Sequence, residues 1–373
     1  MDPLRIAHVD AETGFSGGEA QVFLLMEGLR GLGHEPTLLC PPGSRAEAEA
    51  RARGIPVRAV RMSSDLDLRA VALLKRELDL LRPHLVHLHT GRATWLGGIA
   101  ARLSGLPAIT TRRMDRPVRR GWRTRWVYGS LVDRAVAISP AVRDALLEGG
   151  APQERVSVIP SAVDPRGIEA RADSKARSAT RTAMQADEGA VVLLSLATLV
   201  RRKGLDVLLD ALARAKGTGA PRLEAWIAGE GPERGALEAQ AERLHLREDV
   251  RFLGRRDDAA ELLAGCDVFV LPSRREGLGV SALEAMAARR PVVASRVGGL
   301  ADAVLDGETG LVVEPGDPEA LASAISRLAR DAGLRGRLGE AGRARLAQGF
   351  LAPQMVSAYE KLYRSVLEGV RGP

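Results

Sequence analysis

The sequence predicts two α/β domains, each built on a doubly wound parallel sheet. The chain has 373 residues, which corresponds to two domains at ~100–200 residues each. Short runs rich in Val, Ile and Leu alternate with helix-like stretches along its whole length, a pattern typical of parallel strands buried on both faces. These runs are too many for one sheet of usual size, so we expect two sheets.

The first half supplies the strands and helices of the first domain. The runs that predict its strands are Leu4–Val9, Pro36–Cys40, Val57–Val60, Leu85–Leu88, Ala108–Thr111, Ala135–Ile138 and Val156–Ile159. Helix-like segments lie between them, for example Ala20–Leu32 and Leu68–Leu81. Strands that alternate with helices imply right-handed crossovers between parallel neighbours.

The second half repeats this pattern without repeating the sequence. Its predicted strands are Val191–Leu196, Leu223–Ala228, Val250–Leu253, Val268–Leu271, Pro291–Ala294 and Leu311–Val313. The stretch from Asp164 to Ala190 is polar and lacks a strand-like run, so we place the boundary there. The expected domains are residues 1–164 and 165–354. Apolar helical spacing after Met355 predicts that residues 355–373 form a helix that packs back on the first domain.

Composition excludes several classes of protein. The 54 basic and 47 acidic residues give a net charge of +7. Two cysteines cannot build a disulfide scaffold or a zinc cluster, and no apolar run reaches the ~18 residues of a membrane span. The N-terminal segment lacks the basic and apolar regions of a signal peptide. We therefore expect a cytoplasmic protein of a reducing compartment.

The densest chemical cluster runs from Ser273 to Glu284. A strand ends at Pro272, a glycine-containing loop follows, and a helix begins near Val280. Free backbone N–H groups at a helix start suit a diphosphate. Glu276 and Glu284 bracket the loop and, as paired acceptors, suit the diol of a ribose or sugar. The alternative is a solvated Glu276 and a Glu284 that only complements the helix dipole.

These residues resemble the retaining family-4 glycosyltransferases of the GT-B fold. Glu276 and Glu284 match the Glu-x7-Glu motif of that family. The resemblance covers nearly all of the second half, through segments 199–204, 228–232, 252–254, 267–273, 291–294, 298–299 and 307–313. It implies two Rossmann-like domains that face a cleft, with the acceptor on the first domain and a nucleotide-sugar donor on the second.

The resemblance implies roles for the donor residues. Lys203 contacts the donor diphosphate, where a fixed cation stabilises the departing charge and makes a metal unnecessary; we expect no metal and no other cofactor. Lys203 is thus expected to be catalytic, as is Glu276, which lies by the donor sugar, whereas Glu284 holds the ribose hydroxyls. The remaining expected contacts to the donor come from Gly277, Leu278, Gly279, Arg255, Thr198 and Arg202. Thr198 stands where the family has Arg, and Arg202 is a basic residue close by.

Two features of the first domain extend the expected site. Gly17 and Gly18 stand between the first strand and the first helix, where backbone can approach a ligand closely; a plain tight turn is the alternative. His87 and His89 end a strand, and His89 resembles the cleft histidine of the family. Its expected role is catalytic, polarising hydroxyls near the reacting sugar, whereas a packed histidine is the simpler interpretation.

A basic and aromatic segment lies between Thr111 and Arg134. It predicts contact with an anionic membrane or an acidic acceptor, while nucleic acid binding is discounted because no recognised motif accompanies it. A solvated arginine-rich face is the alternative. The residues that we assign to this surface are Arg112, Arg113, Arg119, Arg120, Trp122, Arg123, Arg125 and Trp126.

The sequence therefore predicts a retaining glycosyltransferase that moves a sugar from a nucleotide diphosphate sugar to a cell-envelope glycan or lipid-linked acceptor. A UDP-sugar is favoured over a GDP-sugar, and the location is cytoplasmic with peripheral contact to the inner face of the membrane. Two alternatives stay open. One is another enzyme of the same fold, such as a nucleotide-sugar epimerase or a sugar-phosphate synthase. The other is a non-catalytic nucleotide-sugar binding protein, which Thr198 supports.

Overall fold

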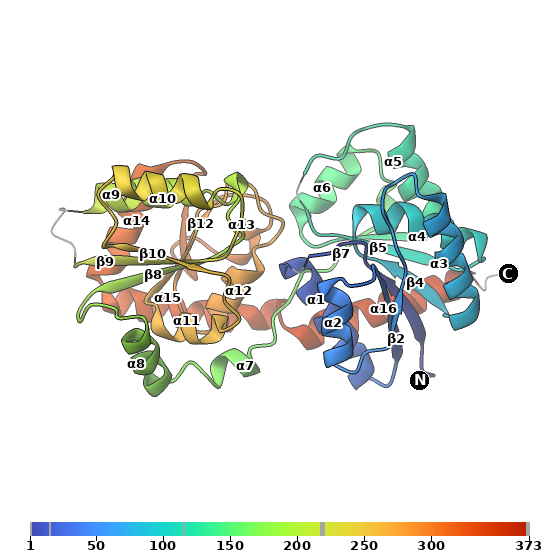
Figure 1. The fold of residues 1–373 in the computed structure, drawn as a ribbon, viewed down its shortest axis with the longest axis horizontal. Helices are drawn as coiled ribbons and strands as arrows, with labels where there is room; N and C mark the ends of the chain where they lie inside the picture. The colour runs from blue at the N-terminus through green and yellow to red at the C-terminus, as the bar shows by residue number, and fades with distance from the viewer. Residues whose placement is uncertain (1, 15, 115, 217–220, 371–373) are drawn as a thin grey trace. The chain divides into compact units, whose positions relative to one another are not determined.

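The computed structural model describes residues 2–14, 16–114, 116–216 and 221–370, and the chain divides into two compact units (Figure 1). Unit 1 comprises Met1–Ser161 and Ala352–Pro373, and unit 2 comprises Ala162–Leu351. The sequence placed the boundaries after residues 164 and 354, and the structure divides the chain after residues 161 and 351.

Unit 1 is a seven-stranded parallel sheet in the order β3-β2-β1-β4-β5-β6-β7. Its strands are β1 (Arg5–Val9), β2 (Glu35–Cys40), β3 (Val57–Ala59), β4 (Leu85–Leu88), β5 (Ala108–Arg112), β6 (Arg134–Ala137) and β7 (Val156–Val158). Its helices are α1 (Gly17–Gly31), α2 (Arg45–Ala52), α3 (Leu68–Leu81), α4 (Gly91–Leu103), α5 (Trp122–Trp126), α6 (Pro140–Glu148) and α16 (Ala352–Val370). Strand order reverses between β1 and β4, and ligands of doubly wound folds bind at such a point.

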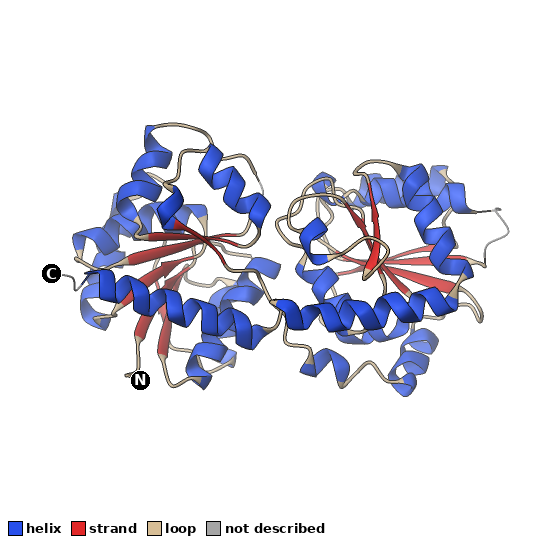
Figure 2. Cartoon of the chain, turned by 180° about the vertical axis from the view of Figure 1, so that it is seen from behind, coloured by secondary structure: helices blue, strands red, loops and turns tan. Residues whose placement is uncertain are grey.

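Helices cover both faces of this sheet (Figure 2), and the central strands β1 and β4 are buried along most of their length. Side chains alternate along β2, so its two faces meet different helices. Leu38 packs in a cluster with Phe23 and Met26 of α1. Leu39 packs in another cluster with Leu74 of α3 and residues of α4. The continuous apolar runs of the sequence thus reflect burial from above and below.

The last helix, α16, belongs to unit 1 and packs on α1. A Cβ atom at Gly28 would lie 2.3 Å from Val356 Cγ2, so only glycine allows this approach. Two buried tyrosines attach α16 to the sheet through polar contacts. The Tyr363 hydroxyl lies 2.7 Å from His87 Nδ1, and the Tyr359 hydroxyl lies 2.9 Å from Thr111 Oγ1.

Unit 2 is a six-stranded parallel sheet in the order β10-β9-β8-β11-β12-β13, which reverses between β8 and β11. Its strands are β8 (Val191–Leu196), β9 (Leu223–Ala228), β10 (Val250–Gly254), β11 (Val268–Leu271), β12 (Val292–Ser295) and β13 (Gly310–Val313). Its helices are α7 (Arg166–Glu169), α8 (Ser174–Ala183), α9 (Leu205–Ala215), α10 (Arg234–Arg243), α11 (Ala259–Gly265), α12 (Val280–Ala287), α13 (Leu300–Ala303), α14 (Pro318–Arg330) and α15 (Ala332–Arg345).

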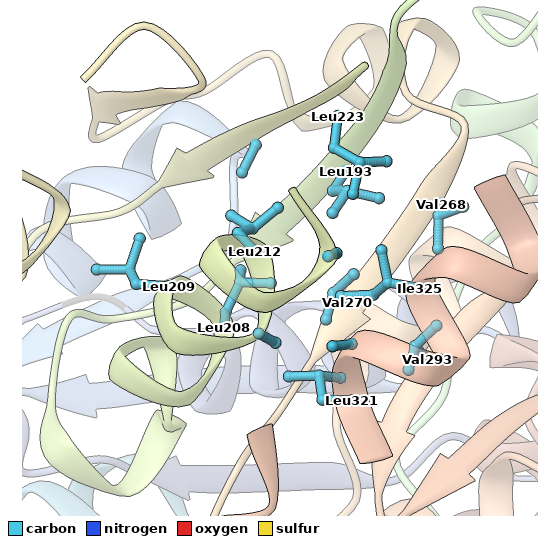
Figure 3. Packing of buried hydrophobic residues seen from close by; sticks show 14 of the residues in the cluster. Leu193, Leu208, Leu209, Leu212, Leu223, Val268, Val270, Val293, Leu321 and Ile325 are labelled. Carbon is cyan, nitrogen blue, oxygen red and sulfur yellow. The ribbon is translucent and has the colours of Figure 1, made fainter. Parts of the chain in front are cut away.

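The core of unit 2 lies between the sheet and two helices. Val270 of β11 and Leu193 of β8 meet Leu208 of α9 and Ile325 of α14 in one apolar cluster (Figure 3). These residues are almost fully buried. The cluster fixes the central strands, whose carboxyl ends carry the loops with the predicted donor residues.

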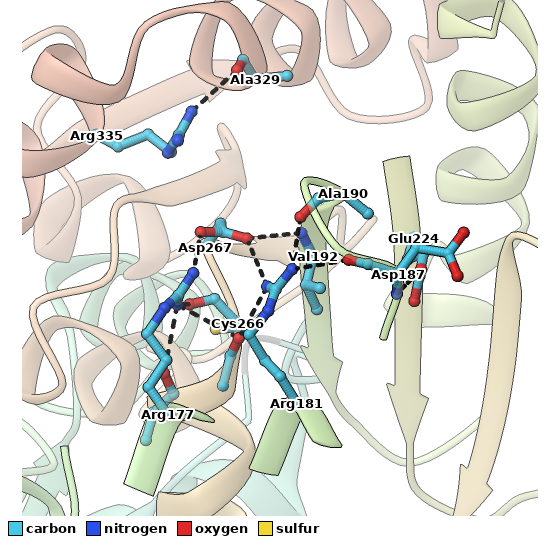
Figure 4. Close-up of polar contacts among 12 residues, drawn as sticks. Arg177, Arg181, Asp187, Ala190, Val192, Glu224, Cys266, Asp267, Ala329 and Arg335 are labelled. Atoms are coloured by element: carbon cyan, nitrogen blue, oxygen red, sulfur yellow. Dashed lines mark hydrogen bonds and ion pairs between the residues drawn. The ribbon is translucent and has the colours of Figure 1, made fainter. Parts of the chain in front are cut away.

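The polar stretch after residue 164 folds as two helices and is part of unit 2. Asp267, which precedes β11, attaches α8 to the sheet (Figure 4). Its carboxylate accepts hydrogen bonds from Arg177 at 2.6 Å, from Arg181 at 3.1 Å and from the Val192 backbone N–H at 2.8 Å. A largely buried carboxylate with three donors is well satisfied, so this segment packs on the domain as an integral part.

Candidate functional site

The predicted donor residues gather where the strand order of unit 2 reverses. Lys203 follows β8 and Glu276 follows β11, and the two strands are neighbours. Lys203 Nζ lies 2.5 Å from Glu276 Oε2, and both side chains are buried. Ser273 Oγ donates a second hydrogen bond to the same oxygen at 3.1 Å. The sequence analysis predicted both residues as part of the site but did not predict their ion pair. This pair places a cation and an anion together where the strand order of unit 2 reverses.

A glycine allows the loop after β8 and the loop after β11 to approach each other closely. Gly204 has a φ of +66°, and a Cβ atom there would lie 1.9 Å from the Pro272 carbonyl oxygen. The Arg274 backbone N–H donates to the Arg202 carbonyl at 2.7 Å, and the Arg274 guanidinium pairs with Asp206 through two contacts of 2.6 and 2.7 Å. These contacts fix the position of Lys203 relative to Glu276.

We expect Gly204→Ala to destabilise unit 2 and to weaken donor binding. An L-residue in the left-handed region costs about 1–2 kcal/mol, and the clash with Pro272 adds to that cost because backbone must move. Gly316→Ala is the matched control, since Gly316 has a φ of +81° but open space around its Cβ position. Thermal unfolding should show a clearly larger loss for Gly204→Ala; equal losses would mean that the loop contact is unimportant.

The glycine loop leads into α12. Gly279 precedes the helix with a φ of +84°, and no side chain caps the first turn. Gly277 and Leu278 are buried, and the Gly277 carbonyl accepts from the Gly299 backbone N–H at 3.1 Å. The start of α12 thus presents backbone N–H groups without a side-chain acceptor, as the sequence predicts for a site that receives phosphate or sugar oxygens.

Glu284 lies in the second turn of α12. Within the described part of the chain, no hydrogen bond or ion pair reaches its carboxylate. Burial raises the pKa of Glu284 to about 7. A partly buried carboxylate without a partner is costly, and hydroxyl donors of a ligand would relieve that cost. This arrangement fits the expected contact with ribose hydroxyls.

The remaining donor residues are exposed. Thr198 follows β8 close to the Gly229 turn, where a Cβ atom at Gly229 would lie 1.8 Å from the Ala197 carbonyl oxygen. The Arg202 side chain is exposed at the end of the same loop as Lys203. Arg255 follows β10, which is separated from β8 by β9, and its nearest acid is Asp257 at 3.8 Å. Their roles toward a donor stay predictions.

A second group of polar residues gathers at the switch point of unit 1. Gly17 and Gly18 begin α1, which Ser16 caps in a capping box with Glu19. His8 of β1 lies beside His87 of β4 and beside His89, which follows that strand, and all three histidines are buried. Burial, with contributions from the neighbouring histidines and Arg113, lowers the pKa of His87 and His89 well below the usual range, and burial and Arg113 lower that of His8 to about 3. All three imidazoles are therefore neutral at neutral pH.

The three histidines have ring nitrogens within 4.8 Å of one another, which is a spacing that could hold a metal ion. Their hydrogen bonds argue against that role. His87 contacts Tyr363 and Thr111 with its two nitrogens, each at 2.7 Å, and His8 Nδ1 lies 2.9 Å from His89 Nε2. An ion would have to displace these contacts, so the trio is better explained as a buried polar network.

The basic and aromatic segment divides into three kinds of residue. Arg119, Arg120, Arg125, Trp122 and Trp126 are exposed, with Trp122 at 70%. Arg123 pairs with Asp65 at 2.7 Å and lies over the Trp95 ring at 4.2 Å. Part of the segment is therefore exposed as predicted, whereas Arg112 and Arg113 are half-buried.

The sequence reasoning missed the loop that this surface borders. Asp65 joins the loop to Arg123, and the next apolar residues, Leu66 and Leu68, are 85% and 78% exposed. The signal was present as two leucines in a polar stretch, one just before α3 and one at its first position, but only the fold brings this stretch beside α5. None of the helices in the described ranges combines the length and apolar character needed to cross a bilayer.

Two family models together match most of the chain. The model described as "Glycosyl transferases group 1" matches residues 177–345, and the model "Glycosyltransferase Family 4" matches residues 15–166. A solved structure of Anabaena Alr3699/HepE in complex with UDP and glucose has a TM-score of 0.87 and 22% identity, and covers 97% of this chain and 100% of that one.

Curated relatives point the same way. A GDP-mannose-dependent alpha-(1-6)-phosphatidylinositol monomannoside mannosyltransferase of Mycolicibacterium smegmatis is 31% identical over 83% of this chain and 85% of that protein. The lipopolysaccharide core biosynthesis glycosyltransferase LpsE of Rhizobium meliloti is 38% identical, but the match spans only about half of each chain. The chain therefore belongs to glycosyltransferase family 4, and its two parallel-sheet units have the GT-B fold.

Proposed function

We propose that the protein is a retaining, metal-independent glycosyltransferase that transfers a sugar from a nucleotide diphosphate sugar to a cell-envelope glycan or lipid-linked acceptor. The observation that carries the proposal is the Lys203–Glu276 pair beside the glycine loop at the switch point of unit 2. A cation, uncapped backbone N–H groups and a partnerless carboxylate, Glu284, offer partners for phosphates and for hydroxyls.

Lys203 supplies the electrostatic part of the mechanism. An ammonium has three N–H donors, and Glu276 takes one of them, so donors are left for the diphosphate. Negative charge grows on that group as the bond to the sugar breaks, and a preorganised cation stabilises it most in the transition state. A fixed lysine can thus do the charge stabilisation that a divalent cation performs elsewhere.

The acceptor hydroxyl attacks from the face on which the diphosphate leaves. A new bond forms between the acceptor oxygen and the anomeric carbon, the bond from that carbon to the phosphate oxygen breaks, and the hydroxyl proton passes to the leaving phosphate oxygen. This route requires no protein base, so neither Glu276 beside the donor sugar nor Glu284 at the ribose hydroxyls has to remove the proton.

UDP-sugars are the first donors to test, because the HepE structure contains UDP and glucose. The proposal of a cell-envelope acceptor rests on relatives of the LpsE kind. The test is a thermal-shift screen of UDP- and GDP-sugars, followed by mass spectrometry of products with a lipopolysaccharide core oligosaccharide or phosphatidylinositol. A ligand at a hundred times its Kd stabilises by about 2.7 kcal/mol, and the anomeric configuration of the product, read by proton NMR, checks retention.

The screen also separates the alternatives. A modified sugar from donor alone would favour an epimerase, and a product made with a sugar phosphate as acceptor would favour a synthase. Donor binding with no product from any acceptor would favour a non-catalytic protein. No stabilisation by any nucleotide sugar would overturn the proposal.

We also propose that the cytoplasmic protein docks on the anionic inner face of the cell membrane through unit 1. The docking surface consists of Arg119, Arg120, Trp122, Arg125 and Trp126 together with the adjacent Leu66 and Leu68. Each basic residue near an anionic membrane contributes about 1 kcal/mol. The exposed tryptophans and leucines would add an apolar, salt-resistant part.

We expect sedimentation with phosphatidylglycerol vesicles at low salt, and loss of most of it at high salt, because the Debye length falls from ~10 Å at 0.1 M to ~3 Å at 1 M. Arg119→Ser/Arg120→Ser/Arg125→Ser should remain in the supernatant. The control Arg76→Ser/Arg214→Ser/Arg243→Ser removes the same charge from other exposed positions and should still sediment. If wild type does not sediment at low salt, the surface does not dock on membranes.

A further inference from the structure

We propose that Arg113, and not His89, contacts substrate at the switch point of unit 1, and that its guanidinium binds an oxyanion, a carboxylate or a phosphate. His89 is then a positioning residue that orients Arg113. The identity of the substrate in this inference rests on the proposed transferase function. The binding of an oxyanion by Arg113 does not depend on that function.

Hydrogen-bond roles exclude His89 as the ligand contact. An arginine can only donate, and both terminal nitrogens of Arg113 lie 3.3 Å from His89 Nδ1, which must therefore be an unprotonated acceptor. The neutral imidazole then carries its proton on Nε2 and donates to His8 Nδ1 at 2.9 Å. Both nitrogens of His89 are thus used within the protein, and the residue is only 5% exposed.

The hydrogen bond from His89 also fixes the tautomer of His8. Because His8 Nδ1 accepts from His89, its own proton must lie on Nε2, a fully buried atom without a partner in the described part of the chain. One guanidinium therefore sets the tautomers of two histidines in sequence. It also opposes protonation of the trio, since Arg113 contributes to the lowered pKa values of His8, His87 and His89 after burial.

Within the described part of the chain, Arg113 has no ion-pair partner, and its Nε is buried without a partner. Among the described residues, the hydrogen-bond partners of its terminal nitrogens are the His89 ring and, at 3.5 Å, the His89 carbonyl oxygen. A guanidinium has five donors in a fork that matches carboxylate and phosphate, and this one is half-buried with donors to spare.

Neither of the acids nearby, Asp10 and Glu19, forms an ion pair with Arg113. The charge of Arg113 lowers the pKa of Asp10, but burial has the larger effect and raises that pKa to about 6. Asp10 accepts from the Glu12 backbone N–H at 2.9 Å, and Glu19 accepts from the Ser16 backbone N–H at 2.5 Å. Both carboxylates are therefore directed to the loop before α1. Gly18 lies next to Arg113, since a Cβ atom there would be 3.8 Å from Arg113 Cδ. The guanidinium thus stands beside the start of a helix of 15 residues, where partial positive charge also favours an anion.

Two measurements on the full chain test the inference. Nitrogen-15 NMR of the imidazoles should show the Nε2–H tautomer for His8 and His89. Inorganic phosphate should shift the resonances of Gly18 and His89 in wild type, with at least a tenfold weaker apparent affinity in Arg113→Gln. Arg76→Gln, which removes an exposed charge of α3, should match wild type. Either an Nδ1–H tautomer at His89 or equal phosphate affinity in Arg113→Gln overturns the proposal.

Further arms identify the oxyanion and the role of His89. If UDP alone saturates the Arg113 response, the donor diphosphate is the occupant. If glucuronate or glucose 6-phosphate still shifts these resonances with UDP saturating, the anion belongs to the acceptor. His89→Gln, which retains an acceptor for Arg113, should keep more phosphate affinity than His89→Leu; equal values would remove His89 as the positioning residue. Phosphate binding needs no turnover, so its failure is distinct from failure of the proposed transferase activity.

Discussion

Replacing Lys203 by alanine is expected to lower kcat by about 100- to 1,000-fold while changing the donor KM much less. The reason is that the lysine interaction strengthens as charge develops on the diphosphate, and interactions that are stronger in the transition state appear in turnover. Steady-state kinetics with the donor found by screening checks this split. A loss confined to KM would show that Lys203 binds the ground state and the transition state equally.

The ion pair complicates this experiment and also provides its control. Removing Lys203 leaves Glu276 buried without its partner, and breaking a buried pair costs about 3–5 kcal/mol. Lys203→Ala could thus lose activity by unfolding. Lys203→Met/Glu276→Gln removes both charges, and a buried pair replaced by neutral groups of similar volume is often no less stable. We expect this double variant to melt near wild type and to stay inactive.

The central strands could be predicted from the sequence because they are buried on both faces. Each predicted run overlaps an observed strand, and β4, β8, β9 and β11 have the predicted bounds. The runs are short, rich in β-branched residues and bounded by polar or glycine-containing turns, so burial and local geometry agree. The glycine loop and α12 were predictable for the same reason, since a helix that follows a buried strand must start at its carboxyl end.

Contacts between distant segments could not be predicted. The Lys203–Glu276 pair joins residues 73 positions apart, and the His87–Tyr363 contact joins residues 276 apart. Only the strand order brings β8 beside β11. The sequence predicted that the last helix packs on the first domain, but not which residues of the sheet it contacts. The polar stretch after residue 164 was interpreted as a boundary because it lacks a strand-like run. Its helix α8 is held instead by arginines that pair with Asp267.

The role of Glu284 can be tested by pH, because its pKa is raised from 4.5 to about 7 by burial. If ribose hydroxyls bind the ionised carboxylate, binding below pH 7 must release a proton. Linkage then predicts that the donor Kd rises by about tenfold for each pH unit below the pKa and stays constant above it. The raised pKa of Glu284 also affects stability, because it favours the folded state at acid pH. This stabilising contribution is lost as the pH rises from 4.5 through about 7.

Glu284→Gln should abolish the pH dependence of the donor Kd and the contribution of this residue to the pH dependence of stability. Glutamine keeps the volume and an acceptor oxygen but loses a charge-assisted hydrogen bond of about 1.5–3 kcal/mol. The donor should therefore bind about 10- to 100-fold more weakly to the variant at pH 8. The Kd of the variant should not change with pH between about pH 5 and about pH 8. Calorimetry with the screened nucleotide sugar measures Kd across this range for both proteins. The variant should also gain stability relative to wild type above pH 7, since a partnerless buried charge is gone. A wild-type Kd that is flat across pH 7, or a variant with wild-type affinity, would show that Glu284 does not hold the donor and that its unpartnered carboxylate has another purpose.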